Sequence, residues 1–431
     1  MNLKTLSLFA LPMLACASTS LFAQLQSMDD RELSAVTGQA YIAVDQTVNP
    51  NNANVSYTRV SYGMDIETQL NAETVELGKY HRWENHPTNP ALNGTACYTC
   101  NGTEQGLEKN SADILIENLS LGYINNADYR DKYKSVPIQV KGFDSRGRVI
   151  NYAENEIAPF LIKNPYLEFA YDEVSHEMIG VRIGFGEAKG MLSGNILSLT
   201  GAIDVDIRDG VEGLSSARQK QDGNLIEEAL TLLTPLLVAG GELSAQAALV
   251  DDNGELDPVR SSNIGMPNGS EFKIEGADPI AAAAVPLLSN VGLIGSDSRS
   301  EFVSLFGCGL FNLLSCYNIY IESDNCVMLG IPTCFPLTNF QTMPVGKVEE
   351  INGRQYLTDT VEGLFLSFQS KSVAWSTAAN LNASQHGSFV NAPSGAFLNL
   401  PTGSVKVNLS EVYNGISGQR REYIDRGVGM F

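Results

Sequence analysis

The sequence predicts a mainly β protein, with antiparallel sheets arranged as a sandwich or a solenoid wall and a helical insertion in the middle of the chain. Apolar and polar residues alternate in many short runs, and turn residues recur about every eight to twelve positions between them. The 39 glycines and the low charged fraction of 18% agree with frequent turns between short strands.

The alternation is clearest in GAIDVDIRDG, where Ile203, Val205 and Ile207 share one parity and charged residues hold the other. One face of this strand is therefore expected to be buried, while the other contacts water. A hairpin is predicted further upstream, because the alternating run VPIQV is followed by the turn residues GFDSRGR and the second run RVINYA.

The middle of the chain breaks this pattern. Residues 224–250 carry apolar side chains at helical spacing, with Pro235 as a kink and glycines 240 and 241 as a stop. The Ala-rich run from Asp278 predicts a second helix, and the polar segment between the two has the composition of a long surface loop.

The length of 431 residues predicts more than one unit, because single cores stop growing at about 250 to 300 residues. We expect a signal peptide over 1–23, a β unit with a short leading helix over 24–215, a helical insertion and loop over 216–300, and a second, disulfide-tied β unit over 301–431. The formal net charge of −21 argues against a nucleic-acid partner.

The N-terminus predicts export. Lys4 precedes an apolar run from Leu6 to Ala17, and small residues follow as far as Ala23, which is the order of a secretory signal peptide. A lipoprotein would use Cys16, but the residues before it lack the usual Leu at the third position back. The expected location is therefore the cell surface, the medium or the periplasm, with Gln24 as the first mature residue.

Six cysteines remain after this cleavage, and an even number in an exported chain predicts disulfides. Four of them follow the spacing C-x7-C-x9-C-x7-C, which leaves nested pairing and neighbour pairing both open. A zinc site is disfavoured for these four, because zinc ligands usually include two cysteines within about four residues of each other. The remaining two form a CxxC in a Gly/Asn-rich loop, which favours a small structural disulfide over a redox site. The six are Cys97, Cys100, Cys308, Cys316, Cys326 and Cys334.

Residues 302–321 form an uncharged apolar run that is long enough to cross a bilayer. The run contains two asparagines and two cysteines of the regular array, and it lacks basic flanks. We therefore interpret it as buried strands in a hydrophobic hairpin, and we predict no transmembrane helix.

Motifs for catalysis are missing from the sequence. It contains no GxSxG and no phosphate-binding Gly loop, and the four histidines lack metal-ligand spacing. The best cation candidate is a weak calcium site in DDNGELD, where oxygen ligands alternate around a Gly turn at Asp251, Asn253, Glu255 and Asp257. It departs from a calcium loop because Gly is fourth and Ser262 is twelfth. We predict no other cofactor and no enzymatic activity.

Two stretches resemble a known family. LQSMDDRELSAVTGQAYIAV, with its "LSxVxGQA" segment, and the strand-rich run from IKNPYLEFAYDE to GNILSLTGAIDVDI resemble exported proteins of Gram-negative bacteria described as pilus-system (Fil-type) proteins or as domains of unknown function. The resemblance covers about half of the chain. It implies an exported component of a surface appendage and gives no catalytic residues to carry over.

Three functions follow from these observations. The first is a non-enzymatic cell-surface or pilus-like component that acts through assembly or adhesion, with envelope or appendage proteins or a second copy as partners. The second is a binding protein for an apolar ligand or lipid, based on the Ala/Leu-rich middle and the 302–321 run. The third is an exported hydrolase, based on scattered carboxylates and the loop that holds His81, Glu84 and His86.

Overall fold

The computed structural model describes residues 41–81, 83, 112–127, 136–209, 242–290, 294–308, 314–328, 331–378 and 388–418. The chain divides into two units, Met1–Tyr41 and Ile42–Phe431, each defined by the contacts within it. The signal peptide and the short helix predicted over 28–40 lie outside the described residues. The architecture of the larger unit confirms the prediction of a mainly β fold.

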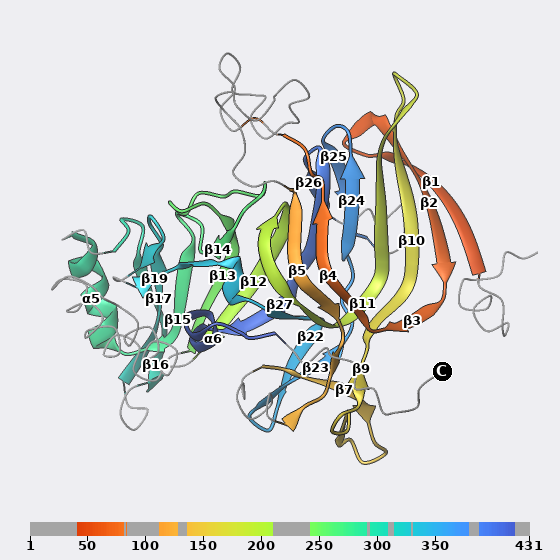
Figure 1. Ribbon diagram of the computed structural model, residues 1–431. Helices are drawn as coiled ribbons and strands as arrows, with labels where there is room; N and C mark the ends of the chain where they lie inside the picture. Colours follow the sequence, from red (N-terminus) through yellow and green to blue (C-terminus); the bar gives the residue numbers. More distant parts are fainter. Residues whose placement is uncertain are drawn as a thin grey trace, which may run out of the picture. The chain divides into compact units, whose positions relative to one another are not determined.

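One main sheet runs through the larger unit (Figure 1). Its strands pair in the order β1 (Tyr41–Asn49), β2 (Asn52–Gly63), β10 (Phe160–Asp172), β11 (Glu177–Leu199), β24 (Phe365–Gln369), β27 (Gly395–Asn408), β12 (Gly201–Asp209), β13 (Glu242–Val250), β15 (Glu271–Ala277), β17 (Leu314–Glu322) and β16 (Arg299–Cys308). The β12–β27 pair is parallel, whereas the other pairs from β2 to β16 are antiparallel. Strands β1 and β16 stand at the two ends of this order.

Strand β11 belongs to two sheets. Its first half pairs with β10 and β24, and its second half pairs with β5 (Ile114–Leu121) and β21 (Thr342–Val345); β4 (Leu70–Leu77) extends this second sheet beyond β5. The passage from one sheet to the other occurs at Gly190, where φ is +156° and a Cβ would lie 2.6 Å from the Phe160 ring. A glycine is required there because the backbone and the ring are in close contact.

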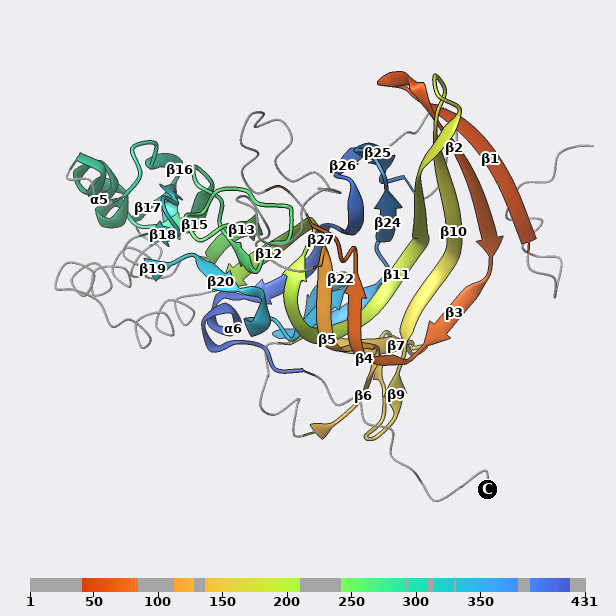
Figure 2. The same ribbon diagram turned by 45° about the horizontal axis from the view of Figure 1, so that its top comes forward.

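Smaller strand pairs surround the main sheet (Figure 2). The predicted hairpin over 136–152 is confirmed as β7 (Ile138–Phe143) and β8 (Val149–Asn151), which join β22 (Lys347–Ile351) and β23 (Arg354–Asp359) in a four-stranded sheet. Three separate pairs join β6 (Tyr123–Ile124) to β9 (Ile157–Ala158), β18 (Val327–Met328) to β19 (Ile331–Pro332), and β25 (Val373–Ser376) to β26 (Phe389–Ala392). The short strands β3 (Asp65–Thr68), β14 (Asn263–Gly265) and β20 (Cys334–Pro336) belong to the main sheet. The described helices are α5 (Pro279–Asn290), η3 (Leu337–Asn339) and α6 (Leu409–Asn414).

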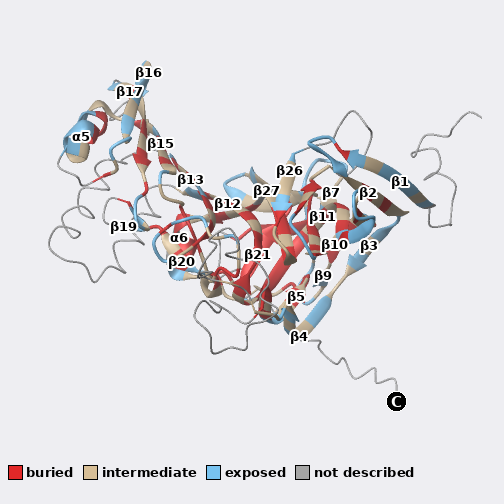
Figure 3. Ribbon diagram, turned by 90° about the horizontal axis from the view of Figure 1, so that it is seen from above, coloured by how far each residue is buried: buried red, intermediate tan, exposed pale blue. Residues whose placement is uncertain are grey.

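The core follows the predicted alternation. Ile203, Val205 and Ile207 of β12 are 1%, 2% and 5% exposed, which confirms the buried parity of that strand. Figure 3 shows buried residues concentrated along the inner strands such as β11, β12 and β21, with exposed residues at β1, β3 and β16.

The helical insertion predicted for the middle of the chain is corrected in one of its described parts. Residues 242–250 form strand β13, whose odd-numbered residues from Leu243 to Leu249 are buried, so the period is two rather than that of a helix. The expected surface loop contains strands β14 and β15. The Ala-rich run does form helix α5, and residues 210–241 lie outside the described residues.

The predicted domain boundaries at residues 215 and 300 are also corrected. Strands β12 and β13 pair across the first boundary, and β15 and β17 pair across the second. The β12–β27 pair joins residue 201 to residue 398, so the two β units and the insertion share one sheet. Residues from Ile42 onward therefore form one compact unit.

Candidate functional site

The first candidate surface is the outer face of strand β1. Its large aliphatic residues Ile42, Val44 and Val48 are 58%, 63% and 52% exposed. Gln46 lies on the same side of the strand and donates a hydrogen bond to the Thr58 hydroxyl of β2 at 3.4 Å. Because side chains alternate along a strand, the even-numbered residues of β1 share the face of Thr58.

The same face stays apolar across the neighbouring strands. Val60, Leu167, Ile183 and Leu366 lie directly opposite one another on β2, β10, β11 and β24. Ile183 is 41% exposed and the other three are half-buried. Met178 reaches this face as well, because the register shift in the β10–β11 pair places it opposite Tyr171, and it is 56% exposed. We call this surface, from β1 to Ile183, the β1 face.

The second candidate surface is strand β16, at the opposite end of the main sheet. Phe302, Val303, Leu305 and Phe306 are 55%, 54%, 67% and 70% exposed. Because consecutive residues are exposed, both faces of the strand contact solvent. The β16–β17 register shifts after Phe302 and again after Ser304, so the apolar part of β16 is irregular before it pairs again at Cys308. We call this part, together with Leu314 of β17, the β16 tip.

These strands test the interpretation of residues 302–321. The hairpin is confirmed, since β16 and β17 pair as antiparallel neighbours. Burial was expected for both strands and is wrong for β16, because nothing in the described part of the chain covers its apolar side chains. In that same part, no helix has the length and apolar character needed to span a membrane.

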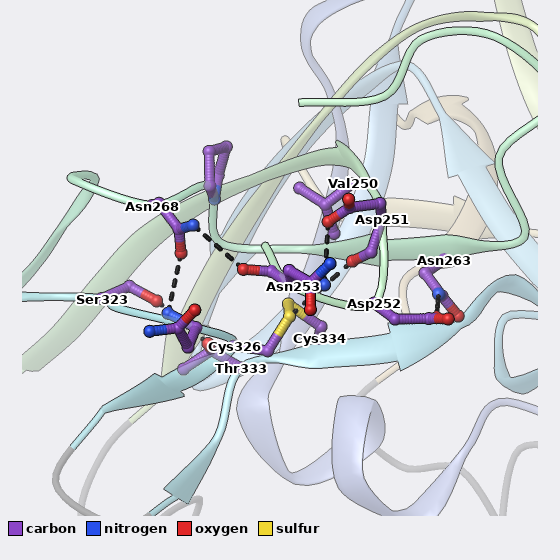
Figure 4. The surroundings of a disulfide bond; sticks show 12 residues. Val250, Asp251, Asp252, Asn253, Asn263, Asn268, Ser323, Cys326, Thr333 and Cys334 are labelled. Carbon is purple, nitrogen blue, oxygen red and sulfur yellow. Dashed lines mark hydrogen bonds between the residues drawn. A yellow bond between two sulfur atoms is a disulfide. The ribbon is translucent and has the colours of Figure 1, made fainter. Parts of the chain in front are cut away.

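The predicted disulfide array is partly resolved. Cys326 and Cys334 are bonded, with their Cα atoms 5.1 Å apart, and the bond ties the segment before β18 to strand β20 (Figure 4). This neighbour pairing excludes the nested order that the spacing left open. Cys316 is also disulfide-bonded. Cys97, Cys100 and the side chain of Cys308 lie outside the described part of the structure.

The predicted calcium residues lie in the segment that follows β13, and Figure 4 shows two of them, Asp251 and Asn253. One carboxylate oxygen of Asp251 accepts hydrogen bonds from the backbone N–H groups of Asn253 and Glu255, at 2.8 and 2.9 Å. The Asn268 amide donates to the Asn253 carbonyl and to the Glu255 carboxylate, both at 2.9 Å, while Asp257 accepts a 3.4 Å bond from Val259 N–H. Among the described residues, no group of three or more His, Cys, Asp or Glu side chains is placed so that it could hold a metal ion. The contacts favour a turn-forming role.

Sequence reasoning missed a buried ionic row on the inner face of the main sheet. Arg59, Glu168 and Arg182 lie opposite one another on β2, β10 and β11, and their side chains are at most 1% exposed. Glu168 accepts a hydrogen bond from each guanidinium, at 2.9 Å from Arg59 and 2.5 Å from Arg182. One signal was present in the sequence. Each charged residue lies at an alternate position of its strand, two residues from a buried Tyr, Ala or Gly on the same face.

The ionic row holds the β25–β26 hairpin against the sheet. Arg182 donates to the Ser376 carbonyl at 2.7 Å, and Arg59 donates to the Ala378 carbonyl at 3.2 Å. The Arg182 guanidinium also lies 5.0 Å from the centre of the Trp375 ring, which is fully buried. The row therefore connects residues that are 194 and 319 positions apart through charge-assisted bonds.

The pKa values of Tyr57 and Arg182 are shifted further above neutral pH. Burial raises the pKa of Tyr57 to about 12, although a hydrogen bond from Asn49 opposes the shift. Burial lowers the pKa of Arg182, but the charge of Glu168 more than compensates, so the net shift is upward. Both groups therefore remain protonated at neutral pH.

A second buried pair anchors the early strands to the end of the chain. Arg260 donates from Nε to Asp113 at 2.9 Å, and the other Asp113 oxygen accepts the backbone N–H of Ala396 at 2.8 Å. Arg260 also donates to the carbonyl of Gly78, where an added Cβ would lie 2.1 Å from Asp113. The contacts connect β4, β5 and β27.

The histidine loop of the hydrolase hypothesis is largely outside the described residues. Glu84, His86 and His386 are not described, His81 is half-buried, and His176 is exposed in the turn between β10 and β11. Of the four histidines, only His81 and His176 therefore lie in the described part of the structure.

The N-terminal part of the chain matches a known protein family. The family is described as "Family of unknown function (DUF6160)", and the match covers residues 1–123, which include strands β1 to β5. The match names no activity. No curated protein and no solved structure matches the chain. Strand β1 lies inside the matched segment, whereas β16 lies far outside it.

Proposed function

We propose that this chain is an exported, non-enzymatic component of the cell surface or of a pilus-like appendage, and that it acts through assembly or adhesion. The observation that carries the proposal is the exposure of apolar side chains on both end strands of the main sheet. Partners are other envelope or appendage proteins, or further copies of the chain.

End strands of this kind are unusual in a protein that works alone. Soluble proteins protect a sheet end with charged residues, Pro or a covering element, because an open apolar strand pairs with other chains. Here residues 302–321 carry no charge at all, in a chain whose formal net charge is −21. An apolar end that no described segment covers is explained by a partner that covers it.

Export is supported by the cysteines and by the N-terminus. The bond between Cys326 and Cys334 is of the kind that persists in oxidising compartments. The predicted signal peptide over 1–23 would deliver the chain to such a compartment. Within the described residues, the buried charges contact one another and nearby backbone groups, which supports a structural rather than a catalytic role.

A deletion strain and its complemented partner test this proposal. We expect the complemented strain to carry the chain in its surface or shed fraction, and electron microscopy of that fraction to show filaments or adhesive material that the deletion strain lacks. A complementing copy without residues 1–23 should stay in the cytoplasm and fail to restore the phenotype. Identical surfaces and identical adhesion in all three strains would refute the proposal.

The same material separates assembly from ligand binding. Organic extracts of the purified protein are analysed by mass spectrometry, and the assembly proposal expects no stoichiometric lipid or apolar compound. A compound bound in equimolar amount would instead favour the function of a binding protein for an apolar ligand or lipid.

A further inference from the structure

We infer that copies of this chain join head to tail, with the β16 tip of one copy packed on the β1 face of the next. The inference rests on the proposed function and deepens it by naming the partner and the two surfaces. Both surfaces belong to one hydrogen-bonded sheet, at opposite ends of its strand order (Figure 2).

The two surfaces are different, which sets the symmetry of the assembly. A contact between unlike surfaces leaves one free β1 face and one free β16 tip on every oligomer. Addition can then continue at both ends, and a rotation that does not close gives an open filament. This is the geometry that an appendage component requires.

The exposed area is sufficient for a specific contact. The β16 tip offers five large apolar side chains that are 40–70% exposed, namely Phe302, Val303, Leu305, Phe306 and Leu314. The β1 face offers five that are 41–63% exposed, namely Ile42, Val44, Val48, Met178 and Ile183. Burial of all ten side chains, with both faces of the β16 tip in contact, would remove on the order of 1,000 Å² from water, which reaches the lower limit for a specific interface.

Edge-to-edge pairing of β1 with β1 of another copy is disfavoured by charge. Strand β1 runs from Tyr41 to Asn49, so Asp45 is its middle residue. An antiparallel β1–β1 contact in the symmetric register places Asp45 opposite Asp45, and like charges directly opposite destabilise a strand pair. The uncharged segment 302–308 meets β1 without this repulsion.

Two variants of the oxidised chain 24–431 test the inference. The β16 variant carries Leu305→Lys and Phe306→Lys, and the β1 variant carries Ile42→Lys and Val44→Lys. All four side chains are more than half exposed, so circular dichroism and thermal unfolding should match the wild type. The matched control is Leu256→Lys, whose side chain is 65% exposed in the turn after β13.

We expect wild type and control to self-associate in sedimentation velocity and to form filaments by negative-stain microscopy. Each double variant alone should have its apparent Kd raised at least about tenfold, because the contact would desolvate two ammonium groups. An equimolar mixture of the two variants should give discrete dimers, since each retains the surface that the other has lost.

Other outcomes overturn the inference in distinguishable ways. If one double variant alone still dimerises as well as the wild type, the contact joins like surfaces. If the wild type stays monomeric while the surface fraction of cells still contains filaments with this chain, self-association fails and the proposed function survives through another envelope protein. If the wild type floats with phosphatidylcholine vesicles and the β16 variant does not, the tip is a lipid-binding surface.

Discussion

Gly184 of β11 lies under the ring of Tyr166, its direct partner on β10. A Cβ at position 184 would lie 2.1 Å from the Tyr166 Cζ atom, so the missing side chain makes room for the ring. Tyr166 is 3% exposed, and the Arg59 guanidinium stacks on it at 4.0 Å. The position of the ionic row therefore depends on a glycine in the neighbouring strand.

Gly184→Ala should destabilise the protein by about 1–3 kcal/mol, because the added methyl displaces the Tyr166 ring from a packed interior. Urea unfolding followed by tryptophan fluorescence measures the change. Gly418→Ala is the control, since its Cβ would meet no atom closer than 3.7 Å, and it should shift stability by less than about 0.5 kcal/mol. Adding Tyr166→Leu to Gly184→Ala should relieve the clash, whereas additive losses in the double variant would contradict the packing argument.

Glu168→Gln should be more damaging than loss of an ion pair at the surface. The amide keeps the volume but removes the only negative charge of the ionic row, which leaves the guanidinium groups of Arg59 and Arg182 buried together. We expect a loss of about 3–5 kcal/mol in unfolding free energy. The control, Glu275→Gln, breaks a half-exposed pair with Lys273 and should cost less than about 1 kcal/mol. Equal losses in the two variants would show that the row is not an electrostatic unit.

Many strands could be predicted because the alternation of apolar and polar residues along a strand is visible in the sequence itself. The alternation of Ile203, Val205 and Ile207 predicts a strand as soon as one face is taken to be buried. The β7–β8 hairpin is predicted by the turn residues between its two strands. The sequence of strand β13 favours a helix instead, because ELSAQAALV is rich in small residues and Leu, which are good helix formers. Its burial between β12 and β15 overrides that propensity.

The candidate site was harder to predict, for two physical reasons. The residues of the ionic row hold the buried parity of their strands, but charged side chains are usually exposed, and only the pairing of β2, β10 and β11 shows that Glu168 contacts both arginines in the interior. The 302–321 run is plainly apolar, but its burial depends on which strand ends the sheet. That order is set by contacts such as β12 with β27, which join distant parts of the chain.

Replacing both Cys326 and Cys334 by Ser should lower the unfolding free energy by about 2–3 kcal/mol, the chain-entropy contribution expected for a short closed loop. Differential scanning calorimetry measures the loss. Peptide mapping without reduction should recover these two cysteines in one linked peptide from the wild type. A linked peptide that joins Cys326 to Cys316 instead would contradict the neighbour pairing.

Glu187 should make stability depend on pH below its ordinary pKa. The Thr360 hydroxyl and the Lys163 ammonium, the latter at 3.0 Å, hydrogen-bond its carboxylate and lower its pKa from 4.5.

Because the folded pKa is depressed, the carboxylate contributes stability that is fully present above about pH 4.5 and is lost as the pH falls through the folded value. The wild type should therefore exceed Glu187→Gln by about 0.5–1 kcal/mol at pH 7, since the pair is only two-thirds buried, and the gap should close in acid. Chemical unfolding from pH 7 to pH 3 measures it, with the exposed Glu177→Gln as control, expected to stay within about 0.5 kcal/mol of the wild type. A gap that widens in acid would show that the protonated carboxyl is the favoured form.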